Sequence, residues 1–423
     1  MTAQPPPVLS SYDDEVPHPG ADAELAARFA GLRRRRTAAH TTPAADVVLV
    51  VGSSRGGTSL LTELLRAHPD LLSLPGEMNP AVVIAQLAGG DAGVFRAELM
   101  RQVGHPARPD EVDRDQLVAD VQWRLTAQWP RLKFDDDLPA DWVDAALRTG
   151  GADPATFGAG LLERVAAAEP AVSLAAYDGS AGSMSDPAPP PAAPVVEMTP
   201  YIGFRPWRPA TGSELRHQPV VIAAPRNSYR LDWLVGQLAP ARVRVVHLTR
   251  NPAASVNGLI DGWHHPAFFS TPVPQRLDIA GYTELGAWGR SWWKFDVPPR
   301  WRELTTAPLA AVAAEQWRST HAAALDFAAR GDAPVLRVRY EDLVGPAAAR
   351  EAVVLQLAEF IGADPAPLRD RVVAGIDPVM ATAPPRQRRW AAGVHDLSPA
   401  LAEPSVWEIA VALGYEAEEA LWI

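Results

Sequence analysis

The chain has 423 residues, a net charge of −11 and no cysteine, with 47% hydrophobic and 21% charged residues. These proportions are those of a globular protein, and the missing cysteines exclude disulfides, thiolate catalysis and cysteine-ligated zinc. The acidic balance argues against a nucleic-acid-binding protein, and the chain has neither a run of about 18 apolar residues nor a secretory leader. We therefore expect no membrane anchor and a cytoplasmic location.

The first 45 residues are predicted to be a leader that is partly disordered and partly helical. Residues 1–20 contain three consecutive prolines and scattered acidic residues, which is typical of disorder. A short helix is expected over 21–39, and it carries four arginines in a row at 33–36. The run is interpreted as a solvated helix end, with polyanion binding as the alternative. Residues 46–423 are expected to form one domain.

Residues 47–51 form an apolar run rich in valine, which predicts a parallel strand buried on both faces. The loop that follows has Gly52 and Gly57 at the spacing of the Walker A pattern and Ser59 at its hydroxyl position, but Thr58 replaces the lysine. A helix begins next, so the backbone N–H groups and the helix dipole form an anion site. Without the lysine, the loop is predicted to bind a phosphate-like anion other than the ATP triphosphate.

Segment 81–170 is rich in Ala, Leu and Trp and predicts helices, so 81–195 is interpreted as a helical insertion with a linker-like stretch at 179–194. Strands and helices alternate afterwards. Strands are expected at 220–223, 243–248 and 335–338, and helices at about 229–239, 252–260, 309–330, 351–360 and 404–413. This alternation predicts an α/β fold with a parallel sheet flanked by helices, of the P-loop NTPase-like kind.

Three stretches resemble the motifs of sulfotransferases, which transfer a sulfuryl group from 3′-phosphoadenosine 5′-phosphosulfate (PAPS) and release 3′-phosphoadenosine 5′-phosphate (PAP). Residues 54–61 with Ala67-His68-Pro69 resemble the loop that binds the 5′-phosphosulfate, 245–255 resemble the strand, turn and helix that hold the 3′-phosphate, and 338–343 resemble the R-Y-E-D-L strand end. The resemblance covers 47–80 and 219–395. It implies a bacterial sulfotransferase fold and transfer to a hydroxyl of a small molecule or secondary metabolite.

The resemblance also implies residue roles. Nucleotide contacts are expected from Ser54, Arg55, Gly56, Gly57, Thr58, Ser59, Arg250, Ser255, Tyr340, Arg388, Arg389 and Trp390. Ser255 is expected to replace the family serine, because the position eight residues after Arg250 is Gly258 here. Tyr340 has a strand-end core tyrosine as its alternative, and 386–390 has a solvated basic turn. A family lysine is also missing, and Arg226 or Arg230 is expected to supply its charge.

Sulfuryl transfer needs in-line geometry, charge stabilisation and a base for the acceptor hydroxyl. Arg55 is expected to stabilise charge on the leaving phosphate. Glu77 is the favoured base, and His264 and His265 are the competing candidates. No metal is expected, because the histidines are scattered and no grouped acidic triad is present.

Two other functions stay open. A P-loop kinase or NTPase is disfavoured by Thr58 and by Thr249-Arg250, where a Walker B carboxylate would be expected. A non-catalytic nucleotide-binding protein is disfavoured by Arg55, Glu77 and Arg250. The tryptophan-rich stretch 286–301 is interpreted as core, with a wall over the acceptor as the alternative.

Overall fold

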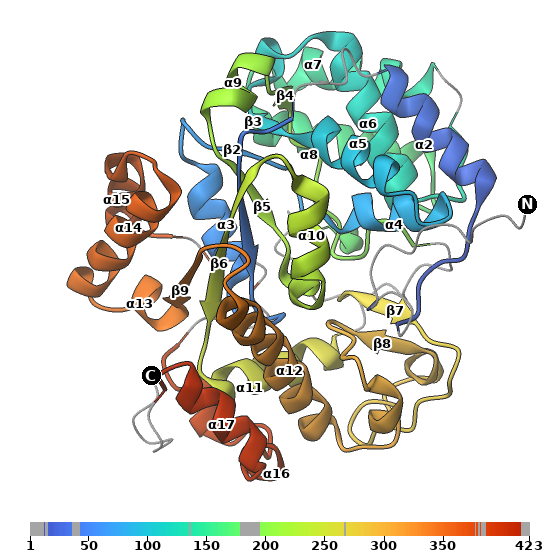
Figure 1. The fold of residues 1–423 in the computed structure, drawn as a ribbon. Coiled ribbons are helices and arrows are strands. Elements are labelled where there is room, and N and C mark those ends of the chain that lie inside the picture. Colours follow the sequence, from blue (N-terminus) through green and yellow to red (C-terminus); the bar gives the residue numbers. More distant parts are fainter. Residues whose placement is uncertain are drawn as a thin grey trace, which may run out of the picture.

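The computed structural model describes residues 12, 16–35, 43–134, 137–177, 195–265, 268–376, 378–379, 381 and 386–415. A seven-stranded sheet runs through its centre in the order β4-β3-β2-β5-β1-β6-β9 (Figure 1). The strands are β1 (Asp46–Val51), β2 (Leu72–Ser73), β3 (Gly104–Pro106), β4 (Trp207–Pro209), β5 (Val220–Ala223), β6 (Arg242–Thr249) and β9 (Val335–Arg339). Strands β2, β5, β1, β6 and β9 pair in parallel, and β3 and β4 extend one edge in antiparallel pairing.

Strand β1 is buried on both faces because helices cover both sides of the sheet. Val47, Leu49 and Val51 face one core, and Val48 and Val50 face the other. The first core is completed by α4 (Asn79–Leu87), α5 (Ala92–Gln102), α10 (Leu231–Leu238) and α12 (Leu309–Arg330). The second is completed by α3 (Thr58–Arg66), α13 (Tyr340–Val344), α14 (Ala347–Ile361) and α15 (Pro365–Ala374). The expected α/β fold, with its parallel sheet between helices, is confirmed.

The helical insertion forms a core of its own at the upper right of Figure 1. This core is formed by α6 (Arg114–Gln128), α7 (Leu138–Gly150) and α8 (Pro154–Ala168), with 3₁₀ turns at Pro109–Glu111 and Leu174–Ala176, whereas α4 and α5 pack on the sheet. The edge strands β3 and β4 were not expected, because each has three residues and includes a proline, so neither shows strand alternation. The linker-like stretch 179–194 lies outside the described residues.

The described parts of the leader pack against the domain. Helix α2 (Ala23–Arg35) buries Phe29, whose ring lies 6.0 Å from that of Trp123, and Arg33 donates to Glu98 at 2.5 Å. Arg33 is therefore a structural ion-pair partner and not a solvated charge. The expected disorder of 1–20 does not hold for Tyr12, which is buried and stacks on Tyr229 with ring centroids 4.9 Å apart. The division of the chain at residue 45 stays a prediction.

A further core lies beyond the carboxyl ends of β1 and β6. It joins α12 to α11 (Pro252–His264), the hairpin of β7 (Ser270–Pro272) and β8 (Trp292–Lys294), α16 (Ser398–Leu401) and α17 (Pro404–Ala412). Trp293 and Trp301 are fully buried there, 5.9 Å apart, so the core interpretation of the tryptophan-rich stretch is confirmed for both.

The remaining elements are α9 (Gly212–His217) and 3₁₀ turns at Pro225–Arg230, Ala287–Arg290, Trp301–Leu304 and Arg389–Ala392. None of the helices in the described ranges combines the length and the apolar character needed to cross a membrane.

A buried histidine pair links the sheet to α12. His247 on β6 and His321 on α12 are each 1% exposed, and Nε2 of His247 lies 2.8 Å from Nδ1 of His321. Burial lowers the pKa of His247 to about 3 and holds the pKa of His321 well below its usual range. Both rings are therefore neutral at pH 7, with one donating to the other.

Acidification is expected to destabilise the fold through this pair. The unfolded chain protonates His247 below a pKa of about 6.5, whereas the folded chain does so only near about 3, so stability present at pH 7 is lost as the pH falls. Between pH 7 and pH 5, His247 alone should account for about 2 kcal/mol of unfolding free energy, measured by urea titration. His247→Gln should remove this share, and His217→Gln, on the surface of α9, should not. The same pH dependence in wild type and His247→Gln would contradict the assignment.

Candidate functional site

Residues 52–59, the loop after β1 together with the first two residues of α3, are called the phosphate loop here. Gly57 precedes α3 with φ 101°, a left-handed conformation that favours glycine. A Cβ at Gly57 would lie 2.3 Å from the ring of Tyr340, so the ring contact also requires glycine. No side chain of the described residues caps α3, and Thr58 and Ser59 line a cavity. The first amides of the helix are therefore available to an anion.

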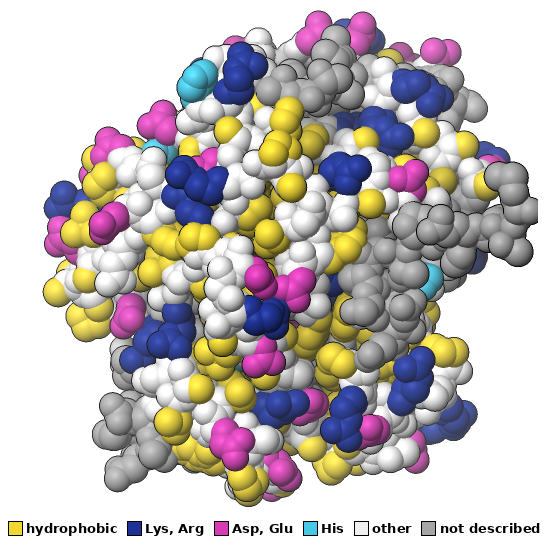
Figure 2. Space-filling model, in the orientation of Figure 1, with side chains coloured by type: hydrophobic (Ala, Val, Ile, Leu, Met, Phe, Trp, Pro, Cys, Tyr) yellow, Lys and Arg dark blue, Asp and Glu magenta, His cyan; other side chains and the backbone are white. Residues whose placement is uncertain are grey.

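The cavity measures about 490 Å³ and lies where four parallel strands, β1, β5, β6 and β9, end. Among the described residues, its lining holds six arginines and two carboxylates, Glu77 and Glu341. The arginines are Arg55, Arg226, Arg250, Arg386, Arg388 and Arg389. On the face of the molecule shown in Figure 2, basic and acidic side chains are interspersed. The cavity thus concentrates positive charge in a chain whose net charge is −11.

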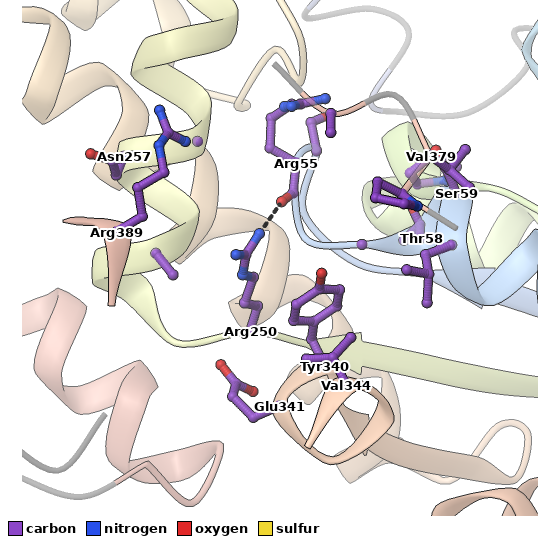
Figure 3. Close-up of a pocket in the computed structure, with 18 of the residues that line it drawn as sticks. Arg55, Thr58, Ser59, Arg250, Asn257, Tyr340, Glu341, Val344, Val379 and Arg389 are labelled. Carbon is purple, nitrogen blue, oxygen red and sulfur yellow. Dashed lines mark hydrogen bonds between the residues drawn. The ribbon is translucent and has the colours of Figure 1, made fainter. Parts of the chain in front are cut away.

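Arg250 follows β6 and is fixed by two contacts (Figure 3). Its guanidinium lies 4.4 Å from the ring centre of Tyr340, and its Nη1 donates to the backbone oxygen of Arg55 at 3.2 Å. Tyr340 therefore contacts both the arginine and Gly57 of the phosphate loop. The neighbouring Glu341 accepts from the backbone and side-chain nitrogens of Asn251, each at 2.9 Å, and so holds the start of α11.

Arg55 has φ 63°, which is rare for a residue with a side chain. Its guanidinium lies 4.7 Å from the ring centre of Phe268. Burial lowers the pKa of Arg55 to about 10, Arg250 acts in the same direction, and Asp261 opposes both. Arg55 is thus still charged at pH 7, and a neutral ring orients it.

The basic stretch 386–390 joins the cavity instead of projecting as an isolated turn. Trp390 is 7% exposed, and Arg388 lies 5.3 Å from its ring. Arg389 donates to Asp261 on α11, and His395 shares that carboxylate, with its Nε2 2.8 Å from Oδ1. Contacts to α11 therefore position this segment.

Glu77 lines the cavity beside Arg226. The side-chain amide of Asn79 donates to its Oε2 at 2.6 Å. Burial raises the pKa of Glu77 to about 7, against the opposing effects of Arg226 and Asn79. Glu77 therefore exchanges a proton near neutral pH, as a general base requires.

The two competing histidines lie elsewhere. His264 is exposed, with its Nε2 2.9 Å from the backbone oxygen of Gly281, and the ring of His265 packs 5.2 Å from that of Phe268. Neither is among the residues that line the cavity. The geometry brings together the phosphate loop and Glu77, and leaves both histidines outside.

Asn257 was missed by sequence reasoning, whereas the expected Ser255 points elsewhere. Ser255 is fully buried, its Oγ lies 3.5 Å from the backbone oxygen of Arg250, and it does not line the cavity. Asn257 does line it, is 3% exposed, and its Oδ1 has no hydrogen-bond partner within the described residues. The available signal was its spacing, since seven residues after Arg250 is close to two helical turns.

Gly56 and Arg230 support the site without facing it. The Gly56 N–H donates to the backbone oxygen of Ser53 at 3.0 Å, which closes the turn of the phosphate loop. Arg230 lies 4.6 Å from the ring of Tyr12 and donates to Asn227 at 2.7 Å. Of the two arginines considered for the missing lysine, Arg226 is therefore the one in the cavity.

The sequence matches no protein-family model, and no curated protein matches it. Among solved structures, the chain is similar to three sulfotransferases. The sulfotransferase domain from the Synechococcus PCC 7002 olefin synthase is 14% identical, with a TM-score of 0.37 over 89% of this chain and 97% of that chain. The sulfotransferase domain from the curacin biosynthetic pathway is 14% identical, with a TM-score of 0.38 over 88% of this chain and 99% of that chain. Sulfotransferase STF9 from Mycobacterium avium is 13% identical, with a TM-score of 0.39 over 93% of this chain and 82% of that chain. These similarities are remote, so the functional argument depends on the residues of the site.

Gly57→Ala is expected to destabilise the protein by about 2–4 kcal/mol in urea unfolding, since it combines the left-handed penalty with displacement of the Tyr340 ring. The loss should be smaller when Gly57→Ala is made in a Tyr340→Leu background, because the ring is gone. Gly236→Ala on α10 is the control, because a Cβ there meets nothing within 4 Å. Equal losses for Gly57→Ala in both backgrounds would show that the ring does not impose the glycine.

Proposed function

We propose that the protein is a PAPS-dependent sulfotransferase that sulfates a hydroxyl of a small molecule or secondary metabolite. One observation supports this most: a cavity with a helix N-terminus and six arginines also holds a carboxylate, Glu77, with a pKa of about 7. PAPS and PAP carry negative charge at both the 5′ and 3′ positions, so a strongly cationic cavity suits them.

The residues fit the nucleotide in two groups. The phosphate loop, with the amides and hydroxyls of Thr58 and Ser59, would hold the 5′-phosphosulfate. Arg250 lies just before α11, and Asn257 lies on α11. The resemblance implies the 3′-phosphate site at this place. The unpartnered Oδ1 of Asn257 is a hydrogen-bond acceptor, so it would take a donor of the nucleotide, such as a ribose hydroxyl, and the phosphate itself would be held by Arg250.

The residues around the transfer have complementary tasks. A bond forms between the acceptor oxygen and sulfur, and the bond from sulfur to the 5′-phosphate oxygen breaks. Glu77 takes the acceptor proton, while Arg55 and Arg226 offset the charge that moves onto the leaving phosphate. Asp296, which accepts from the Ser54 N–H at 2.9 Å, fixes the loop from behind.

Nucleotide binding is the first test of the function. Calorimetry should detect PAP and PAPS binding and no comparable binding of ATP–Mg²⁺, because the loop lacks the Walker lysine. EDTA should leave sulfuryl transfer intact, as the resemblance implies. ATP–Mg²⁺ binding at micromolar concentration without PAP binding would reject the proposal and favour the kinase or NTPase alternative.

Arg250→Ala is expected to weaken PAP binding by about 2–4 kcal/mol, because a partly buried charge-assisted contact is lost. Adenosine 5′-phosphosulfate, which lacks the 3′-phosphate, should bind wild type and variant almost equally. Arg250→Lys should give an intermediate loss, since the charge stays and the planar fork goes. If both nucleotides lose affinity equally, Arg250 supports the fold and does not recognise the 3′-phosphate.

Glu77→Gln is expected to reduce turnover by about 10²–10⁴-fold, because it keeps the shape but cannot take the proton. PAP affinity should barely change. With wild type, the rate should rise about tenfold between pH 6 and pH 8 as Glu77 ionises around its pKa of about 7, and this rise should vanish in the variant. Near-normal turnover of an alkyl alcohol by Glu77→Gln, with loss of activity in His264→Ala or His265→Ala, would assign the base to a histidine.

A further inference from the structure

A second cavity, of about 100 Å³, adjoins the first. The residues that line both are Thr58, Ser59, Glu77, Arg226, Phe269 and Val379. Because Glu77 lies at this junction, a hydroxyl that reaches its carboxylate from the second cavity faces the arginine-rich cavity beyond. The second cavity is therefore on the acceptor side of the transfer proposed above.

Most of the apolar lining of the second cavity comes from three separate segments. They contribute Pro80 and Val83 from α4, Val196, Met198, Pro200 and Ile202 from the stretch before β4, and Phe269 from the stretch before β7. Val83, Met198 and Ile202 are only partly buried, so part of each side chain is accessible to a ligand. Covering such surface with an apolar ligand is favourable by about 25 cal/mol per Å².

Away from the junction at Glu77 and Arg226, the charged side chains of this wall are paired within the protein. Glu63 accepts from Arg66 and, at 3.1 Å, from Arg205. Burial works to raise the pKa of Glu63, but the two arginines outweigh it and lower the pKa, so Glu63 stays ionised. Glu197 accepts from Arg124 at 2.7 Å, and both side chains are 9% exposed. The charged groups of this part of the wall are therefore engaged within the protein, and Arg226 lies at the junction with the first cavity.

Much of the remaining polar capacity is used within the protein. Thr62 Oγ1 donates to the backbone of its own helix at 2.8 Å, and Asn79 bridges Glu77 and Asn227 at 2.6 and 2.8 Å. An acceptor with several hydroxyls would bury some of them without partners, at a cost of about 1–3 kcal/mol each. A single hydroxyl, directed to Glu77, avoids this cost.

We propose that the second cavity binds the acceptor, and that the acceptor is an uncharged alcohol with an apolar carbon skeleton and one hydroxyl. The hydroxyl meets Glu77 and the skeleton lies against Val83, Met198 and Ile202. This inference rests on the proposed function and narrows its acceptor class.

Binding of matched probes in the presence of PAP tests the inference without relying on turnover. Calorimetry should show that hexan-1-ol binds at least about tenfold more tightly than 6-hydroxyhexanoate or 6-aminohexan-1-ol, because burying an unpaired charge is costly. Methyl glucoside, a neutral probe with several hydroxyls, should bind more weakly than hexan-1-ol.

Two variants locate the probe in the cavity. Val83→Asp and Ile202→Asp each place a carboxylate in the wall, so each should weaken hexan-1-ol about tenfold or more and favour 6-aminohexan-1-ol, with PAP affinity unchanged. Val373→Asp is the matched control, since Val373 is 83% exposed on α15. Hexan-1-ol binding that is unchanged in both wall variants, or weaker than that of methyl glucoside, would overturn the inference even if PAP binds. Failure of the wild type to bind PAP would instead overturn the proposed function.

Discussion

The concentration of arginines in the first cavity is the feature on which this site depends. The contacts of Arg55 and Arg250 include neutral groups: the rings of Phe268 and Tyr340, at 4.7 and 4.4 Å, and a backbone oxygen that accepts from Arg250. An aromatic ring orients a guanidinium without cancelling its charge, whereas a carboxylate would cancel it. Burial and the neighbouring Arg250 lower the pKa of Arg55, and Asp261 opposes them only in part, so the site disfavours the charged form of Arg55 relative to water. On the proposed function, the phosphates of the nucleotide relieve this repulsion, which couples nucleotide binding to the order of the site.

The second cavity handles its arginines in the opposite way. Arg66 and Arg205 both donate to Glu63, and Arg124, which does not line the cavity, donates to Glu197, while Arg226 lies where the two cavities join. The cationic and the compensated cavities meet at Glu77. Full ionisation at this boundary would offset part of the positive charge that favours an anion, but burial raises the Glu77 pKa to about 7. One carboxylate therefore separates the two environments and can still change its protonation state near neutral pH.

Elements with a strong local pattern were predictable, and elements that depend on their partners were not. Residues 220–223 and 309–330 match β5 and α12 in their bounds, because a continuous apolar run and a long uninterrupted helical segment are signals within the segment itself. The hairpin of β7 and β8 has three-residue strands whose pairing exists only in the folded chain. Tyr12 likewise lies in a polar, proline-rich segment, and its burial depends on contacts with Tyr229 and the backbone oxygen of Val297.

The same distinction applies within the site. The order of the motifs in the sequence was sufficient to predict that the phosphate loop, Arg250 and Tyr340 lie at one site. It did not predict which face of α11 lines the cavity. Ser255 lies three residues before Gly258, so the two residues are neighbours on the helix surface. This spacing alone did not show which neighbour of Gly258 faces the cavity. The cavity is lined by Ala254, Asn257 and Gly258, and Arg389 contacts Asp261, which completes an i, i+3, i+4, i+7 stripe. Ser255 lies about 100° from the start of that stripe and is directed into the core. The face that α11 turns to the cavity depends on the contact of Asp261 with the basic segment at 386–390. Because that contact is formed only in the tertiary fold, the sequence did not show it.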